Sequence, residues 1–124
     1  KNRVHYLGAR DDIIELLSAT DIFVLPTRYR EGIPRVVLEA AAMGLPIVTT
    51  REGAGDTAVV DGENGAIVDP MDQSDLEAKI ESLIGSEQLR GRYGEKSRVI
   101  AETELSVNLI ANEYADVFRR LLKI

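Results

Sequence analysis

Charged residues that could bind an anion gather in the segment 26–35, which reads Pro-Thr-Arg-Tyr-Arg-Glu-Gly-Ile-Pro-Arg. This segment follows the apolar run 22–25 and leads into a helical pattern that opens at Pro34. The first N–H groups of a helix have no intrahelical acceptor and carry about half a positive charge, so they can bind phosphate or carboxylate. Because ligands of open α/β sheets bind at the carboxyl ends of the strands, this segment is the first place to expect a site.

Two charged residues of the expected helix allow two interpretations. Arg35 in the first turn opposes the helix dipole at a cost of roughly 0.3–1 kcal/mol, which suggests a bound anion that offsets it. Glu39, four residues later, could form a surface ion pair with Arg35 that contributes about 0.5 kcal/mol, although this order of charges is the less favoured one. Alternatively, Glu39 accepts hydrogen bonds from the vicinal hydroxyls of a ribose, while Glu31 does the same for another polyol.

Short apolar runs bounded by Gly, Pro or Asp predict the strands that must position these residues. The predicted strands are 4–7, 22–25, 47–50 and 66–68. Helical patterns follow the first two, one capped at 11–12 and one that starts with Pro34 as its first residue and stops at Gly44. We therefore expect a Rossmann-like α/β fold, with a parallel sheet flanked by helices and C-terminal helices behind it. About four strands is fewer than the usual five or six, so the sheet is expected to be truncated.

The C-terminal half carries helical periodicity from Ser74 onward. One apolar stripe comprises Leu76, Ile80, Leu83 and Ile84, and a second comprises Leu105, Leu109, Tyr114, Val117, Phe118 and Leu121. Gly91 and Gly94 interrupt the segment between the stripes, which predicts a broken or short helix there. An alternative for the strand 66–68 is a β-hairpin with residues 59–60, which would make the sheet mixed.

Length and charge exclude several classes of protein. The chain has 124 residues, a net charge of -6, no Cys and one His. This size suits one domain, the acidic balance disfavours nucleic acid, and no apolar run approaches the roughly 20 residues of a bilayer span. The acids follow no ligand spacing and His5 lies in a predicted strand, so we expect no metal site and no catalytic role for His5.

Three stretches together resemble the C-terminal half of family 4 (group 1) retaining glycosyltransferases of the GT-B fold. They are the runs 21–27, 31–40 and 44–48, followed by the turn and strand 61–68. Glu31 and Glu39 match the two ends of the E-x7-E motif of that family. The resemblance implies that residues 1–124 are a single partial domain, the donor-binding half of an enzyme that transfers a sugar from a nucleotide-diphosphate sugar with retention of anomeric configuration.

The resemblance also implies roles for individual residues. Glu31 would be catalytic, contacting the donor sugar near its reacting carbon, and Glu39 would bind the ribose. The remaining donor-binding residues would be Gly32, Ile33, Arg35 and Val36, of which the last three present backbone N–H groups. No cofactor and no metal are implied, because the nucleotide sugar is itself the substrate.

The sequence departs from this family in three places. Many members of the family have a Gly where this chain has Pro34, and a proline has no N–H to donate. The family usually has Gly-Gly or Pro-Gly before an acidic residue in the loop after the strand 47–50, and the run 53–56 matches this only loosely, with Asp56 out of register with the usual Glu. The Arg and Lys that the family uses on the diphosphate would precede residue 1, so we expect the chain alone to be inactive.

The expected partners are a nucleotide sugar and a missing N-terminal acceptor domain. An open sheet edge could also cause self-association of the truncated chain. We expect a cytoplasmic protein, because such donors are made there, and peripheral membrane association of the whole enzyme stays open.

Two other functions compete with this interpretation. Gly53, Gly55 and Ala58 fit the dinucleotide fingerprint G-x-G-x-x-G/A, which would indicate a dehydrogenase fragment, but turn residues soon interrupt the long helix it requires. A flavodoxin-like binding or regulatory domain without enzymatic activity also fits the length and strand count. The cations of the segment 28–35 have no evident packing role, which disfavours that second reading.

Overall fold

A computed structural model describes residues 3–30, 32–54 and 57–124 of the chain. Within these residues the sheet has three parallel strands in the order β1-β2-β3. The strands are β1 (Phe23–Leu25), β2 (Ile47–Thr50) and β3 (Gly65–Val68). The register aligns Ile47 of β2 with Phe23 on one side and with Gly65 on the other. The expected α/β class with a parallel sheet is confirmed, with three strands instead of four.

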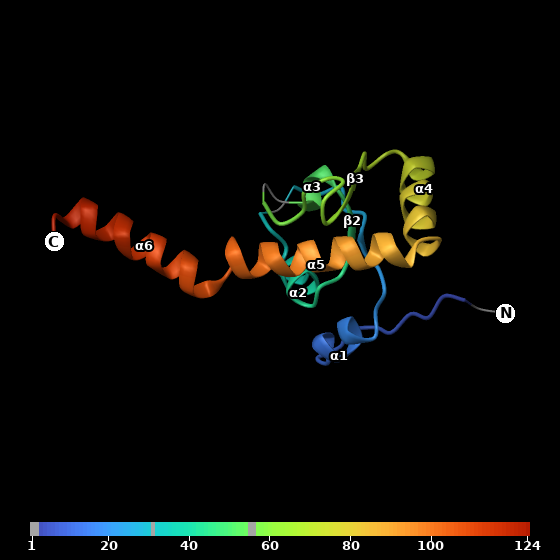
Figure 1. Cartoon of the computed structure of the whole chain (residues 1–124), viewed down its shortest axis with the longest axis horizontal. Helices are drawn as coiled ribbons and strands as arrows, with labels where there is room; N and C mark the ends of the chain where they lie inside the picture. Colours follow the sequence, from blue (N-terminus) through green and yellow to red (C-terminus); the bar gives the residue numbers. More distant parts are fainter. Residues whose placement is uncertain (1–2, 31, 55–56) are drawn as a thin grey trace.

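Helices cover both faces of the sheet (Figure 1). They are α1 (Ile13–Ser18), α2 (Arg35–Ala42), α3 (Arg51–Ala54), α4 (Gln73–Ile84), α5 (Glu87–Thr103) and α6 (Val107–Leu122). The central strand β2 is buried along its whole length. Its Ile47 packs into a core cluster with α1 and α2, whereas Val48 packs with β3 and α4 on the opposite face. Successive residues of a strand point to opposite faces, so β2 supplies both halves of the core.

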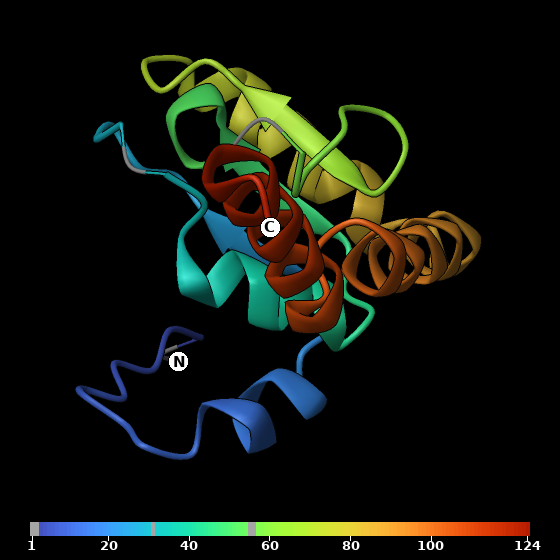
Figure 2. The ribbon, with the colours of Figure 1, turned by 90° about the vertical axis from the view of Figure 1, so that its left-hand side faces the viewer.

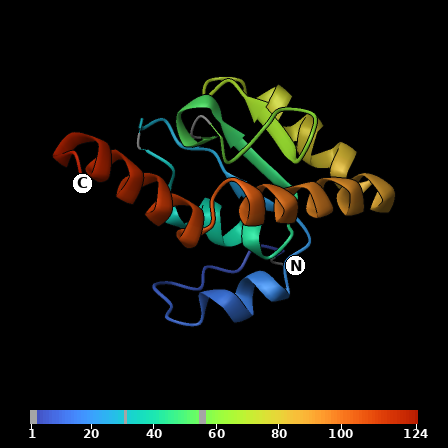
Figure 3. The ribbon, with the colours of Figure 1, turned by 60° about the vertical axis from the view of Figure 1, so that its left-hand side comes forward.

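The predicted strand at residues 4–7 is wrong. These residues lie in exposed coil, and the side chains of Val4 and Tyr6 are 83% and 96% exposed. The chain then enters α1, which packs on α2 through Leu17 and leaves the coil away from the sheet (Figure 3). A strand needs a neighbour for its N–H and C=O groups, and residues 4–7 pair with no described strand.

The hairpin alternative is also wrong, because β3 pairs in parallel with β2. The turn before β3 is held by the buried Asn64 side chain. Its Oδ1 accepts from Val60 N at 2.7 Å, and its Nδ2 donates to Ala58 O at 2.9 Å and to Ser97 Oγ at 3.2 Å. One side-chain amide thus provides hydrogen-bond partners for backbone groups of the turn, Val60 N and Ala58 O, which lie outside the strands.

Helix α5 runs unbroken through both glycines, so the predicted interruption is wrong. Gly94 packs closely against the turn that follows α2, since a Cβ built on it would lie 2.3 Å from the Gly44 carbonyl oxygen. The Ser97 hydroxyl of α5 donates to Leu45 O at 2.7 Å in the same region. Close helix packing, and not a helix break, explains a glycine at position 94.

The apolar stripe of α6 is helical as expected but packs on little else. All residues of α6 are described, and none of them is buried. Figure 2 shows the helix along its axis, and Figure 1 shows that it extends away from the sheet. Tyr114, Phe118 and Leu121 are 64%, 57% and 72% exposed. In the described part of the chain, no helix is long and apolar enough to cross a membrane.

The two glycines of α5 provide a test of this packing. Gly94→Ala should lower the free energy of unfolding by roughly 1–3 kcal/mol, because the added methyl group meets the Gly44 backbone. Gly91→Ala is the matched control, since a Cβ there has no neighbour within 4 Å and should raise the free energy of unfolding by about 0.5–1 kcal/mol. Urea denaturation of both variants measures the difference. Equal effects of the two substitutions would contradict the assigned contact.

Candidate donor-binding site

The residues predicted to bind the donor lie where β1 leads into α2. Gly32 is exposed and Ile33 is half-buried against the core that α2 covers. Glu31 lies outside the described residues, as do Gly55 and Asp56. The structure therefore positions one of the two predicted acids, Glu39, and the loop on either side of the other.

Helix α2 begins one residue later than predicted. Pro34 is the N-cap, with φ -62° and ψ 134°, and its side chain caps nothing. The first intrahelical bond is donated by Val37 N to Pro34 O at 2.9 Å. The N–H groups of Arg35 and Val36 precede that bond, and the first turn contains no acidic residue. An extended Pro fits the N-cap because the cap residue is not itself helical.

Arg35 and Glu39 form an ion pair, with 2.9 Å between Arg35 Nε and Glu39 Oε1. The Arg35 side chain is 90% exposed, whereas that of Glu39 is only 22% exposed. The surface pair predicted as one alternative is thus present, and it leaves the second carboxylate oxygen of Glu39 free of the arginine. Such an exposed pair contributes little to stability.

Glu39 also borders a recess between α1 and α2 of about 450 Å³. The recess is lined by Asp11, Ile13, Ile14, Arg35, Val36 and Glu39. A carboxylate beside free helix N–H groups and apolar side chains can accept hydroxyl groups while the N–H groups take a nearby anion. The geometry therefore allows both chemical roles that the sequence suggested for this helix terminus.

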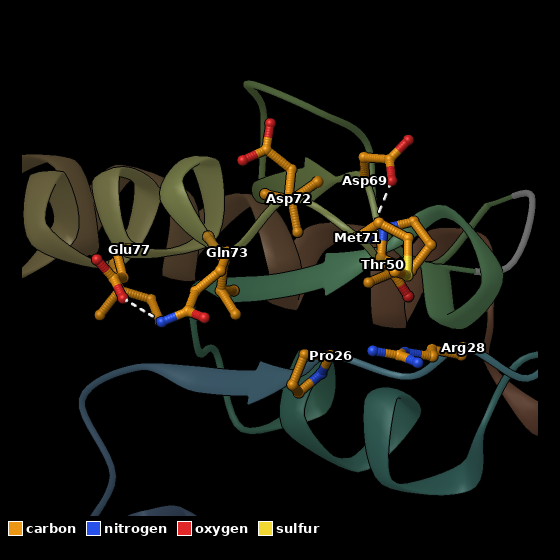
Figure 4. A pocket seen from close by; sticks show the side chains of 12 residues that line it. Pro26, Arg28, Thr50, Asp69, Met71, Asp72, Gln73 and Glu77 are labelled. Atoms are coloured by element: carbon orange, nitrogen blue, oxygen red, sulfur yellow. Dashed lines mark hydrogen bonds between the residues drawn. The ribbon is translucent and has the colours of Figure 1, made fainter.

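A second pocket of about 460 Å³ lies on the α4 side of the strand ends (Figure 4). Arg28 and Pro26 line one side of it, and Asp69 and Asp72 line the other. Asp69 Oδ1 accepts from Met71 N at 2.9 Å, and Asp72 Oδ1 caps α4 by accepting from Asp75 N at 2.9 Å. Sequence reasoning missed this pocket, although Asp72 before the periodic pattern of α4 was a recognisable cap signal.

Glu52 is another residue that the sequence did not single out. It lies in α3, directly after β2, and its Oε2 is buried with no hydrogen-bond partner among the described residues. Buried polar atoms normally have a partner. The carboxyl end of the central strand therefore carries an acceptor that no described residue satisfies.

Two further observations concern the charged residues: one ion pair with shifted pKa values, and whether the described residues form a metal-binding cluster. Arg10 donates a hydrogen bond to Asp12 that lowers the pKa of the Asp12 carboxyl and raises that of the guanidinium, at the exposed start of α1. Across residues 3–30, 32–54 and 57–124, no three His, Cys, Asp or Glu side chains form a possible metal cluster. His5 is exposed.

The described residues lack the turn and long helix that the dinucleotide fingerprint requires after its strand. Helix α3 has four residues, begins at Arg51 directly after β2, and contains Gly53. The fingerprint needs its first glycine in a turn between strand and helix, followed by a long helix. The dehydrogenase alternative therefore lacks structural support.

Comparison with known proteins identifies close sequence relatives. A Campylobacter jejuni protein named N,N'-diacetylbacillosaminyl-diphospho-undecaprenol alpha-1,3-N-acetylgalactosaminyltransferase is 39% identical over 120 residues, which cover 97% of this chain and 31% of that protein. The capsular polysaccharide biosynthesis glycosyltransferase CapM of Staphylococcus aureus is 39% identical over 113 residues, covering 90% of this chain and 29% of CapM. The chain thus spans about a third of the length of these relatives.

Solved structures similar to this chain include complexes with a nucleotide and with a nucleotide sugar. Anabaena HepE in complex with UDP matches with a TM-score of 0.89 and 28% identity, over 96% of this chain and 33% of HepE. HepE in complex with UDP-glucose matches with a TM-score of 0.86 and 28% identity, over 97% of this chain and 33% of HepE.

The sequence model of the family described as Glycosyl transferases group 1 matches residues 1–99. With most of its length matched, the chain belongs to the group 1 glycosyl transferases.

Proposed function

We propose that residues 1–124 form the donor-binding part of a glycosyltransferase that takes a sugar from a nucleotide-diphosphate sugar. The observation that carries the proposal is the open N-terminus of α2, where Arg35, Val36 and the partly buried Glu39 line one recess. Family membership and the UDP and UDP-glucose complexes of HepE support a nucleotide-sugar donor. The acceptor is bound by a part of the protein outside these residues.

Each predicted residue has a chemical task in this proposal. Glu39 accepts hydrogen bonds from the ribose hydroxyls, and Glu31 acts next to the reacting carbon of the sugar. Gly32 lets the backbone approach the donor, since the residue is exposed and no described atom fills the space beside its Cα. The N–H groups of Ile33, Arg35 and Val36 face the sugar or the diphosphate.

The physical basis of catalysis is stabilisation of the leaving group. When the bond from the sugar to the diphosphate breaks, negative charge accumulates on the phosphate oxygens. Fixed N–H dipoles at a helix terminus stabilise that charge without reorganising during the reaction. The transfer proceeds with retention of anomeric configuration, and we propose that residues 1–124 alone do not turn over because the acceptor site is elsewhere.

The reaction takes place in the cytoplasm, where nucleotide sugars are made. A lipid-linked substrate appears in the name of the Campylobacter relative, which contains diphospho-undecaprenol. This supports a whole protein that works at the membrane surface. The competing flavodoxin-like binding domain predicts no response to nucleotide sugars at α2, and the following titration separates the two.

Titration of the whole protein with a panel of nucleotide-diphosphate sugars that includes UDP-glucose should shift the amide resonances of residues 33–39. Glu39→Gln should weaken the affinity at least about tenfold, because the loss of one charge-assisted hydrogen bond costs about 1.5–3 kcal/mol. Nuclear magnetic resonance follows both effects. Unchanged resonances across 33–39 with every sugar would favour the flavodoxin-like binding domain.

The control for this substitution is Glu102→Gln. Arg98 and Glu102 of α5 form an ion pair of the same residue types and spacing, at 2.7 Å. Its loss should change the free energy of unfolding by under about 0.5 kcal/mol, as should the loss of the Glu39 pair. If Glu102→Gln weakens donor binding as much as Glu39→Gln does, the effect at Glu39 is not specific.

Glu31→Ala in the whole protein should abolish transfer while leaving the melting temperature unchanged, because the carboxylate acts on the donor and not on the core. Activity is measured as sugar transfer from the cognate donor, and folding by circular dichroism. Full turnover by the variant would refute the catalytic assignment.

We also propose that the isolated chain self-associates through β1. Among the described strands, only β2 pairs with β1, and its other edge carries no strand. Open edges pair readily with a second strand. Light scattering at high concentration should give a mass above the 13.6 kDa of the monomer. A clean monomer would contradict this proposal.

A further inference from the structure

Three threonines join the end of β2 to the start of the loop that leads to α2. The ladder between β1 and β2 ends at the pair Leu25 and Thr49. At this last pair the Thr49 hydroxyl donates to Leu25 O at 2.8 Å, and beyond it the Thr50 hydroxyl donates to Thr27 O at 2.6 Å. Side-chain hydroxyls thus replace the backbone donors that a continued strand would have supplied.

The loop adds two bonds of its own. Thr27 N donates to Leu25 O at 3.0 Å, and Tyr29 N donates to the Thr27 hydroxyl oxygen at 3.1 Å. We call Thr27, Thr49 and Thr50, with these four hydrogen bonds, the threonine clasp. Thr49 and Thr50 are 0% and 1% exposed, so their hydroxyls have no water to exchange for the loop carbonyls.

Gly53 of α3 packs against two threonines of the clasp, Thr49 and Thr27. A Cβ on Gly53 would lie 2.6 Å from the Thr49 hydroxyl oxygen and 2.7 Å from the methyl carbon of Thr27. Only a residue without a side chain fits against both threonines. Helix α3, the end of β2 and the loop after β1 are therefore packed against one another at the carboxyl ends of the strands.

The geometry points to Thr49 and Thr50 as positioning residues for the donor, an inference that rests on the proposed function. They fix the first residues of the loop, and this loop carries Arg28 and continues to the free N–H groups of α2. Neither threonine needs to touch the nucleotide sugar. Hydrogen bonds that span 24 and 23 residues of sequence set where the donor-binding segment starts.

The test compares Thr50→Val with Thr50→Ser in the whole protein. Thr50→Val keeps the shape but leaves Thr27 O without its donor, so KM for the nucleotide sugar should rise about tenfold while KM for the acceptor changes by less than about twofold. Thr50→Ser restores the hydroxyl and should restore KM. Thr49→Val should act in the same direction, through Leu25 O.

Hydrogen–deuterium exchange supplies a readout that does not depend on activity. Thr50→Val should speed exchange at residues 27–29, whereas Thr103→Val should not. Thr103 is the matched control, because its hydroxyl donates to Val99 O at 2.8 Å in α5, away from the clasp.

The outcomes separate this inference from the proposed function. An unchanged KM for the donor in folded Thr50→Val, unchanged exchange at 27–29, failed rescue by Ser, or equal rises in the KM of donor and acceptor would each overturn the positioning role. If the wild-type protein binds no nucleotide sugar, the proposed function fails, and the exchange measurement still decides whether the clasp holds the loop.

Discussion

The burial of β2 between two parallel neighbours is the constraint on which the rest of the structure depends. All four of its residues are buried, and its side chains supply the two opposite cores in alternation. A buried strand must satisfy every backbone group, so both of its edges are paired and all three strands end at the same side. That shared end is where the loop before α2, the short helix α3 and the loop before α4 meet.

Glycines and buried polar side chains make this arrangement tight. A Cβ on Gly65 would lie 1.9 Å from the Ile47 carbonyl oxygen. At position 65, only a glycine therefore allows β3 to lie this close to β2. Asn64 and Ser97 hydrogen-bond each other and the backbone of the turn before β3 and of Leu45. Neutral hydrogen bonds fix the loops here, and they do so without burying a charge.

The candidate donor site illustrates how a weak surface interaction and the proposed binding role meet at one residue, Glu39. The pair of Arg35 and Glu39 is exposed on the arginine side and partly buried on the glutamate side. Solvent screens the arginine, so the pair adds little to stability. The carboxylate remains held at the rim of the recess beside the start of α2, where a polyol and an anion can be bound together.

The sequence by itself determined the strands β1, β2 and β3 and the stop of α2 before Gly44, because these rest on local periodicity and turn residues. It also singled out the segment 26–35 as the candidate site, through a family motif. The tertiary structure decided what depends on a distant partner. Residues 4–7 are apolar enough for a strand but pair with none of the described strands. From the sequence Gly94 is interpreted as a helix breaker, and only its close packing against Gly44 explains why a glycine lies there. The hydrogen bonds of Thr49 and Thr50 join residues more than twenty positions apart, and local patterns carry no information on such contacts.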